Sequence, residues 1–245
     1  MSDTAIIVGL GNPGPRFADT RHNVGWKVLD LLSEQLQISL NERRPKAVLG
    51  TGYHADQRVV LAKPRTFMNN SGEAVEYLLA RFGGNGRNLV IIYDEMARLP
   101  GRIRLRAAGS DAGHNGIRSV IQAVGGTGFP RVRIGIGAPP AGLVARDYVL
   151  GRFDDQESEA ILGAVDRAAA AVRCLLVEGI DAAMNRFNQD PKAVDDPSES
   201  TPQSPSQPPR SEGSDTGSRS RLQGKISSGQ DEQRRGNTHQ NGQGH

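Results

Sequence analysis

Three amides, two imidazoles and one carboxylate occur in short polar stretches between the apolar runs of this 245-residue chain. A histidine can accept a proton from water, a carboxylate can orient that histidine, and neutral amides can hold a carbonyl group. A kinase or a dehydrogenase would need a phosphate cradle, and a metal enzyme would need more closely grouped ligands. The pattern therefore favours a hydrolytic site in which a base activates water. The residues are Asn12, Asn69, Asn115, His22, His114 and Asp94.

The stretch GLGNPG at residues 9–14 has the G-x-G-x-x-G spacing of a dinucleotide-binding loop. Such a loop needs backbone amides at the start of a helix to hold a pyrophosphate. Pro13 and Pro15 remove two amide donors, and each disfavours helical backbone in the residue before it. We therefore expect a tight loop that brings Asn12 to the carboxyl edge of a sheet, where ligands of open α/β sheets bind.

His22 belongs to a second polar stretch, TRHN, at residues 20–23. Thr20 is a suitable N-cap, so the pattern predicts a helix that begins here with His22 in its first turn. The positive end of the helix dipole would disfavour the imidazolium and leave the ring able to accept a proton. From this stretch alone, a surface histidine at a helix start is the alternative interpretation.

Apolar patterns predict the elements that must position these side chains. Runs rich in β-branched residues indicate strands, and apolar residues three or four positions apart indicate helices. Strands that alternate with helices are typical of a single three-layer α/β domain, and unbroken apolar runs indicate strands covered on both faces. We predict a mixed, mostly parallel sheet flanked by helices, with the polar stretches converging on one edge. Strands are expected at 5–10, 47–53, 59–62, 89–93, 102–106 and 132–136, and helices around 24–36, 75–79, 117–124, 155–178 and 182–187.

The longest expected helix has its own start and stop signals. Asp154 and Glu157 have the spacing of a capping box, and Gly179 is expected to end the helix.

Composition divides the chain near residue 190. Residues 191–245 include only four apolar side chains and no aromatic ones, which is too little apolar surface to offset the entropy of folding. We predict a domain at 1–190 and a disordered tail at 191–245. Cys174 is the single cysteine, so no internal disulfide can form, and no signal peptide or long apolar run is present. A cytoplasmic protein without membrane attachment is expected.

Six stretches together resemble the bacterial peptidyl-tRNA hydrolases. GLGNPG, TRHN, KPRTFMNNSG, YDE, GHNG and FPRVRIGIG stand in order and at family-like spacing between about residues 5 and 188. The resemblance implies hydrolysis of the ester that joins a peptide to the 3′-terminal ribose of tRNA, which recycles tRNA for translation. It also implies a monomeric α/β enzyme without metal or cofactor, with peptidyl-tRNA and tRNA as partners.

The resemblance also implies a role for each residue of the hydrolytic group. His22 is similar to the general base, and Asp94 to the carboxylate that orients it. Asn69 and Asn115 resemble the amides that position the substrate and hold the developing oxyanion. Asn12 resembles the residue that reads the peptide part of the substrate.

Four further positions match residues that line the site in the family. Phe17 and Phe67 match positions along the tRNA 3′ end, Met68 matches an apolar wall, and His114 matches a lining position. Core packing is the alternative for Phe67 and Met68, and helix capping is the alternative for His114. The family usually has tyrosine where Phe17 stands, and its usual His-Asp-x-Leu-Asp appears as YDEMA at 93–97, which loses a second carboxylate.

Arginines alternate on two of the expected strands and therefore share a face on each strand. The net charge of +3 is too small to mark a nucleic-acid surface unless such residues cluster. The resemblance favours Arg104, Arg106 and Arg133 as a clamp for phosphate near the tRNA acceptor end, with solvated edge charges as the alternative. A catalytically silent RNA-binding relative and a hydrolase for another acyl ester remain as competing functions.

Overall fold

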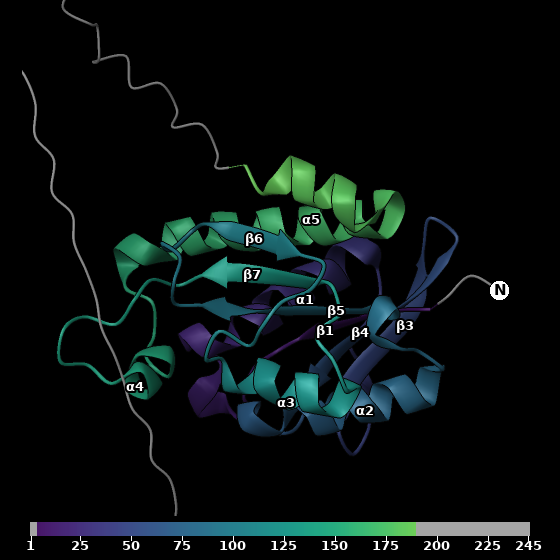
Figure 1. Ribbon diagram of the computed structural model, residues 1–245, viewed down its shortest axis with the longest axis horizontal. Coiled ribbons are helices and arrows are strands. Elements are labelled where there is room, and N and C mark those ends of the chain that lie inside the picture. The colour runs from purple at the N-terminus through teal and green to yellow at the C-terminus, as the bar shows by residue number, and fades with distance from the viewer. Residues whose placement is uncertain (1–3, 190–245) are drawn as a thin grey trace, which may run out of the picture. The chain divides into compact units, whose positions relative to one another are not determined.

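The computed structural model describes residues 4–189, in which helices cover both faces of a central sheet (Figure 1). The sheet has seven strands in the order β2-β3-β4-β1-β5-β7-β6. The strands are β1 (Ala5–Gly9), β2 (Glu42–Arg43), β3 (Ala47–His54), β4 (Gln57–Pro64), β5 (Leu89–Glu95), β6 (Ile103–Arg106) and β7 (Arg131–Gly135). The α-helices are α1 (Val24–Leu36), α2 (Ser71–Phe82), α3 (Asn115–Val124), α4 (Ala145–Val149) and α5 (Asp155–Phe187), and the 3-10 turns are η1 (Pro15–Phe17), η2 (Arg21–Asn23), η3 (Met68–Asn70) and η4 (Gly86–Asn88).

The four central strands, β4, β1, β5 and β7, run parallel. β1 lies between β4 and β5, with Val8 opposite both Ala62 and Ile91. The antiparallel pairings, β2 with β3, β3 with β4 and β6 with β7, lie toward the two edges and equal the parallel ones in number. The predicted mixed α/β sheet is confirmed, with its parallel part in the centre. Because parallel strands end at the same edge, the segments after them emerge side by side.

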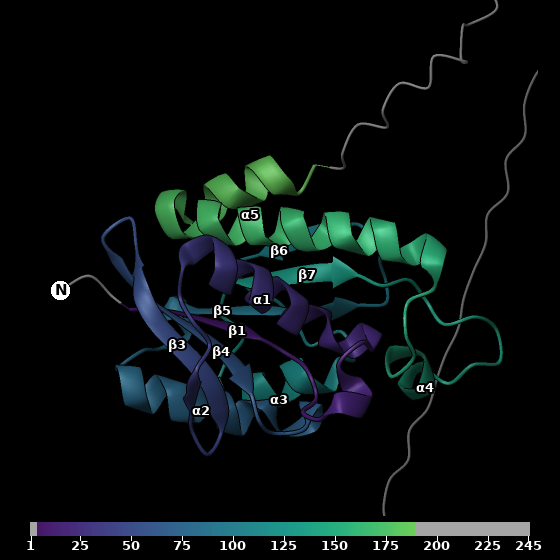
Figure 2. The ribbon, with the colours of Figure 1, turned by 180° about the vertical axis from the view of Figure 1, so that it is seen from behind.

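Alternate residues of the central strands face two hydrophobic cores. On β1, Ile7 packs in the core shared with α1 and α5, whereas Ile6 and Val8 pack in the core shared with α2 and α3. Figure 2 shows α5 above the sheet and α1 in front of it, with α2 and α3 below. Burial on both faces explains why these strands read as unbroken apolar runs.

Glycines in the GLGNPG stretch allow β1 and α1 to approach closely. A Cβ atom on Gly9 would lie 2.3 Å from the carbonyl oxygen of Gly25, well inside van der Waals contact. Gly14 has a φ of 106°, and the chain then makes the short turn η1 rather than an α-helix. The predicted tight loop is confirmed, and the stretch lacks the helix start that a dinucleotide phosphate would need.

The α1 helix begins later than the sequence predicts. Thr20 precedes η2, and its hydroxyl donates to the carbonyl oxygen of Phe17 at 2.8 Å instead of capping a helix. His22 therefore lies in a 3-10 turn, and α-helical backbone starts at Val24. The Thr20 side chain is directed at the preceding turn and makes no capping bond to η2, so the predicted N-cap is absent.

The α5 helix has the predicted capping box and the predicted interruption. Glu157 N donates to Asp154 Oδ1 at 2.8 Å, and Asp154 N donates to Glu157 Oε2 at 3.0 Å. Gly179 has φ 87° and ψ 171°, and helical backbone resumes after it as far as Phe187. The short elements α4 and β2 were not predicted, because each is too short to carry a periodic signal. Within residues 4–189, no helix is long and apolar enough to cross a membrane. The predicted tail at 191–245 lies outside the described residues.

Candidate active site

A cleft of about 820 Å³ opens where the central parallel strands end. Its walls come from the segments after β1, β4 and β5, from the start of α3 and from α4. Polar stretches that are distant in sequence therefore share one cavity, as their places at strand ends and helix starts predict. The predicted residues in its lining are Asn12, Phe17, His22, Phe67, Met68, Asn69, Asp94, His114 and Asn115.

His22 and Asp94 form a largely buried pair at this cleft. The Nδ1 atom of His22 lies 2.8 Å from Oδ1 and 2.9 Å from Oδ2 of Asp94. An ionised carboxylate only accepts hydrogen bonds, so Nδ1 carries the proton and Nε2 is left as the basic nitrogen. The side chain of Asp94 is 2% exposed and that of His22 is 12% exposed. The carboxylate is thus shielded from water while the imidazole reaches the cavity.

His114 is bonded through both of its ring nitrogens. Its Nδ1 accepts from the backbone N–H of Ile117 at 3.2 Å and so caps α3. Its Nε2 therefore carries the proton, which it donates to Oδ1 of Asp94 at 3.1 Å. The two interpretations left open by the sequence, a lining residue and a helix cap, are both correct. One carboxylate thus orients two histidines.

Mutual charges shift the pKa values of this group. Burial lowers the pKa of His22, but the charge and the hydrogen bond of Asp94 outweigh burial, so the pKa lies above its ordinary value of 6.5. Burial raises the pKa of Asp94, yet the charges and hydrogen bonds of His22 and His114 hold it well below its usual range. The direction of this shift is opposite to the one expected from a helix dipole. His22 lies in the 3-10 turn before α1, and its ring is in direct contact with the carboxylate of Asp94.

Asn12 is held in one orientation by three hydrogen bonds. Asn23 accepts from the backbone N–H of Asn12 at 2.8 Å and donates to its carbonyl oxygen at 3.0 Å. The side-chain oxygen of Asn12 accepts from the backbone N–H of Met68 at 2.8 Å. These bonds leave the amide NH₂ of Asn12 as the donor that can face a ligand in the cleft. Sequence reasoning gave Asn23 no role, although it lies in the TRHN stretch.

The other two amides lie on the exposed rim of the cleft. Asn69 belongs to η3, and Asn115 is the first residue of α3. The side-chain oxygen of Asn115 accepts from Arg118 at 3.3 Å, so its NH₂ group is again the free donor. Asn12, Asn69 and Asn115 thus reach the cavity from three different segments, which only the fold brings together.

His22, Asp94 and His114 also have the composition of a metal site, with ligand atoms within 4.8 Å of one another. A metal on Nε2 of His114 would require the proton to move to Nδ1. The backbone N–H of Ile117 already points at Nδ1, so two donors would then face each other. The arrangement therefore fits a hydrogen-bonded acid–base pair better than a metal centre.

Comparison with known proteins shows the family of this chain. The sequence model of a family described as peptidyl-tRNA hydrolase matches residues 6–195. The chain belongs to the peptidyl-tRNA hydrolase family. The peptidyl-tRNA hydrolase of Moorella thermoacetica is 47% identical over 189 residues, which cover 77% of this chain and 100% of that protein. The crystal structure of the Acinetobacter baumannii peptidyl-tRNA hydrolase has a TM-score of 0.72 at 36% identity and covers 77% of this chain and 96% of that one.

The arginines predicted to clamp tRNA line up on the β6–β7 edge of this peptidyl-tRNA hydrolase fold. Arg104 lies opposite Arg133, and Arg106 lies opposite Arg131, so all four point to one face of the sheet. Arg106 is exposed, whereas Arg133 forms an ion pair with the buried side chain of Glu95. Glu95 lines the cleft, so this arginine row, defined as Arg104, Arg106 and Arg133, begins at the cleft edge.

Arg131 was not among the predicted site residues, and its role is structural. Its side chain is buried and donates to the carbonyl oxygens of Ser110 at 3.0 Å and Thr127 at 2.9 Å. It also stacks on Phe129, with 4.2 Å between the guanidinium carbon and the ring centroid. Arg131 therefore joins the loop between β6 and α3, which holds Ser110, to the loop between α3 and β7, which holds Thr127.

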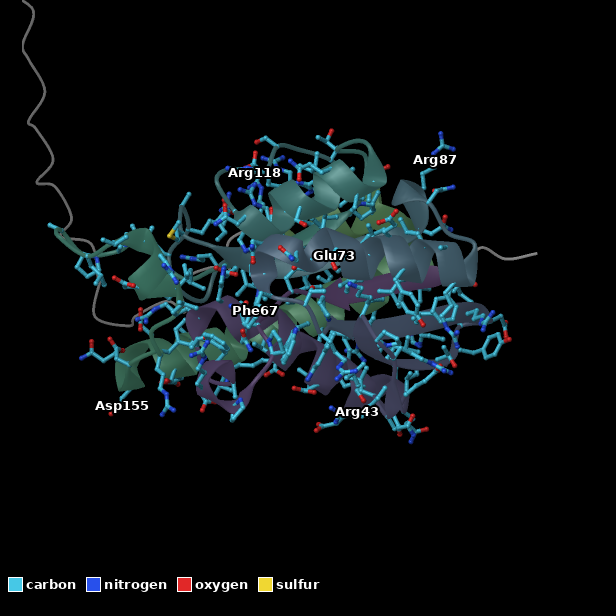
Figure 3. All side chains as sticks on the ribbon, turned by 90° about the horizontal axis from the view of Figure 1, so that it is seen from below. Arg43, Phe67, Glu73, Arg87, Arg118 and Asp155 are labelled. Carbon is cyan, nitrogen blue, oxygen red and sulfur yellow. The ribbon has the colours of Figure 1, made fainter. Side chains whose placement is uncertain are left out.

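Aromatic side chains stand at the mouth of the cleft. The rings of Phe17 and Phe67 meet edge to face with centroids 6.3 Å apart, and Phe67 is 53% exposed. Figure 3 shows Phe67 at the surface on the same side as Glu73 of α2. Met68 is buried beneath them, where a Cβ atom on Gly116 would come within 2.5 Å of its sulfur. Met68 therefore belongs to a hydrophobic core and to the cleft lining, whereas Phe67 offers an exposed ring face.

Proposed function

We propose that this member of the peptidyl-tRNA hydrolase family cleaves the ester between peptide and tRNA with His22 as general base. The observation that carries the proposal is the His22–Asp94 pair, in which Nδ1 is bound and Nε2 remains for a water molecule. The raised pKa of His22 makes Nε2 a stronger base once it is deprotonated.

Each step moves one proton through Nε2. His22 removes a proton from water as the water oxygen attacks the ester carbonyl carbon and the carbonyl oxygen becomes negative. Collapse of this tetrahedral intermediate breaks the bond to the ribose oxygen, which takes the proton back from His22. The products are the peptide acid and tRNA with a free ribose hydroxyl. Asp94 stabilises the imidazolium that exists between the two transfers.

Neutral amide donors serve the developing oxyanion and the peptide. We assign the oxyanion and the position of the ester to the NH₂ groups of Asn69 and Asn115, and the peptide backbone to that of Asn12. A preorganised donor at an oxyanion is worth about 3–4 kcal/mol in acyl transfer. Because the Asn12 amide oxygen is engaged by Met68 N, Asn12 presents a donor suited to a peptide carbonyl.

The tRNA contacts belong to the cleft mouth and the arginine row. We assign Phe17 and Phe67 to the terminal bases: Phe67 offers an exposed ring face for stacking, and Phe17 carries the Arg16 guanidinium 4.4 Å from its ring centroid. Arg104, Arg106 and Arg133 offer charge for phosphates, a contact that does not depend on sequence and suits an enzyme that accepts many tRNAs. We further propose that the catalytic domain is 1–190 and that it works as a monomer in the cytoplasm, where translation produces peptidyl-tRNA.

Release of the N-blocked amino acid from N-acetylaminoacyl-tRNA tests this function. The expected result is turnover of that substrate, with much slower hydrolysis of simple alkyl esters and of unblocked aminoacyl-tRNA. Tight tRNA binding without turnover would identify a silent RNA-binding relative instead. Equal rates on simple esters would identify a general esterase.

A further inference from the structure

Arg21, the residue before His22, has a buried side chain that the reaction itself does not use. Its NH1 group donates to the carbonyl oxygen of Arg152 at 2.5 Å, and its NH2 group forms an ion pair with Glu157 Oε2 at 2.6 Å. Both acceptors lie at the start of α5 or just before it. The turn that carries His22 is therefore tied to a segment far along the chain.

The guanidinium also lies against two aromatic rings. Its central carbon is 4.3 Å from the ring centroid of Tyr148 and 5.2 Å from that of Phe153. Tyr148 belongs to α4, and its hydroxyl donates to the carbonyl oxygen of Ile136 at 2.5 Å. Arg21 thus packs against the helix whose residues Arg146 and Val149 line the cleft.

Backbone contacts strengthen the same connection. The N–H of Arg21 donates to the carbonyl oxygen of Gly151 at 2.9 Å, and Thr20 forms an isolated β-bridge with Arg152. Glu157 Oε2 also accepts from Asp154 N in the capping box of α5. One guanidinium consequently joins η2, α4 and the first turn of α5.

We propose that Arg21 is a positioning residue that fixes the α4 wall of the cleft relative to His22. The inference rests on the proposed function, because it assumes that a substrate lies between the wall and the imidazole. A substrate held by α4 would keep its ester at a constant distance from Nε2 only while this connection is intact. Lysine cannot replace arginine here, because an ammonium lacks the planar fork that bonds two acceptors and stacks between two rings.

The test is Arg21→Lys, compared with Arg87→Lys at an exposed position that Figure 3 shows at the surface. We expect kcat for N-acetylaminoacyl-tRNA to fall by about tenfold or more, since a 1 Å displacement at a reacting centre can cost about 100-fold. The pH at which kcat rises should stay unchanged, because the contact between His22 and Asp94 is untouched. Hydrogen exchange should accelerate at amides 145–151 and not in α2.

Three outcomes would overturn the inference. The first is a wild-type kcat in Arg21→Lys. The second is a shift of the pH at which kcat rises, which would indicate an effect of charge. The third is an unchanged rate of hydrogen exchange at amides 145–151. If Arg21→Lys does not fold, Glu157→Gln takes its place, because glutamine keeps an oxygen for the capping box and removes the ion pair. It should show a smaller loss of kcat and the same local increase in exchange. A wild-type protein without hydrolase activity would refute the proposed function, and the exchange measurement would still test the connection.

Discussion

Replacing Asp94 by asparagine should disable His22 through its tautomer. Oδ1 of Asp94 accepts from both His22 and His114, whereas Oδ2 faces His22 alone. Because Nε2 of His114 must donate, an asparagine has to keep its oxygen at the Oδ1 position. Its NH₂ group then takes the Oδ2 position, 2.9 Å from Nδ1 of His22, while the retained oxygen stays 2.8 Å from the same nitrogen. The NH₂ group admits the tautomer in which Nδ1 accepts and the proton sits on Nε2, and in that tautomer His22 can no longer take a proton from water.

The size of the effect follows from two losses. A hydrogen bond to a charged group contributes about 1.5–3 kcal/mol, and about 1.4 kcal/mol corresponds to a factor of ten in rate. Loss of the charged bond to the imidazolium therefore costs about ten- to 100-fold, and the wrong tautomer adds to it. We expect kcat to fall by at least ~100-fold. Without the carboxylate, burial alone acts on the pKa of His22, so the rise of kcat with pH should move to lower pH.

The assay is kcat on N-acetylaminoacyl-tRNA across the pH range in which imidazole titrates. Asp56→Asn is the matched control, because Asp56 is exposed and has a φ of 63°, a conformation that asparagine tolerates. Circular dichroism and the melting temperature verify that both variants are folded. Near-wild-type kcat with an unmoved pH limb in Asp94→Asn would refute the role given to the carboxylate.

Three other perturbations give distinct expectations. His22→Ala should lower kcat by at least ~100-fold without comparable loss of tRNA binding, and the double variant with Asp94→Asn should be little worse, because the two residues act as one unit; additive losses in this cycle would contradict that coupling. Arg106→Ala should raise KM and should reduce the slope of log tRNA binding constant against log salt concentration by about one, as expected for one lost phosphate contact. A loss confined to kcat would instead mean that Arg106 takes part in the chemical step. Removal of residues 191–245 should leave the melting temperature and kcat nearly unchanged, since the sequence there has little apolar surface to bury; a large fall in either would show that the segment supports the domain.

The sequence by itself determined the fold class, the order of the main elements and the edge at which the site lies. Buried parallel strands need apolar side chains on both faces, so β1 and β5 can be recognised in the sequence as unbroken apolar runs. The sequence also predicted the start and the break of α5 correctly. The capping box of Asp154 and Glu157 and the break at Gly179 could be predicted because they depend only on residues close together in the chain. His22 and Asp94 could be placed in one site because each lies at the end or the start of an element on that edge.

Only the tertiary structure decided how these residues act on one another. His22 has a raised pKa because a carboxylate from β5 touches its ring and outweighs the effect of burial, whereas the sequence led to the expectation of a helix dipole that disfavours the charged ring. The double role of His114 and the contacts of Arg21 with Tyr148 and Glu157 join segments that are distant along the chain. Such contacts leave no periodic trace in the sequence, because they depend on how separate elements pack, whereas helix and strand patterns depend on spacing within one element.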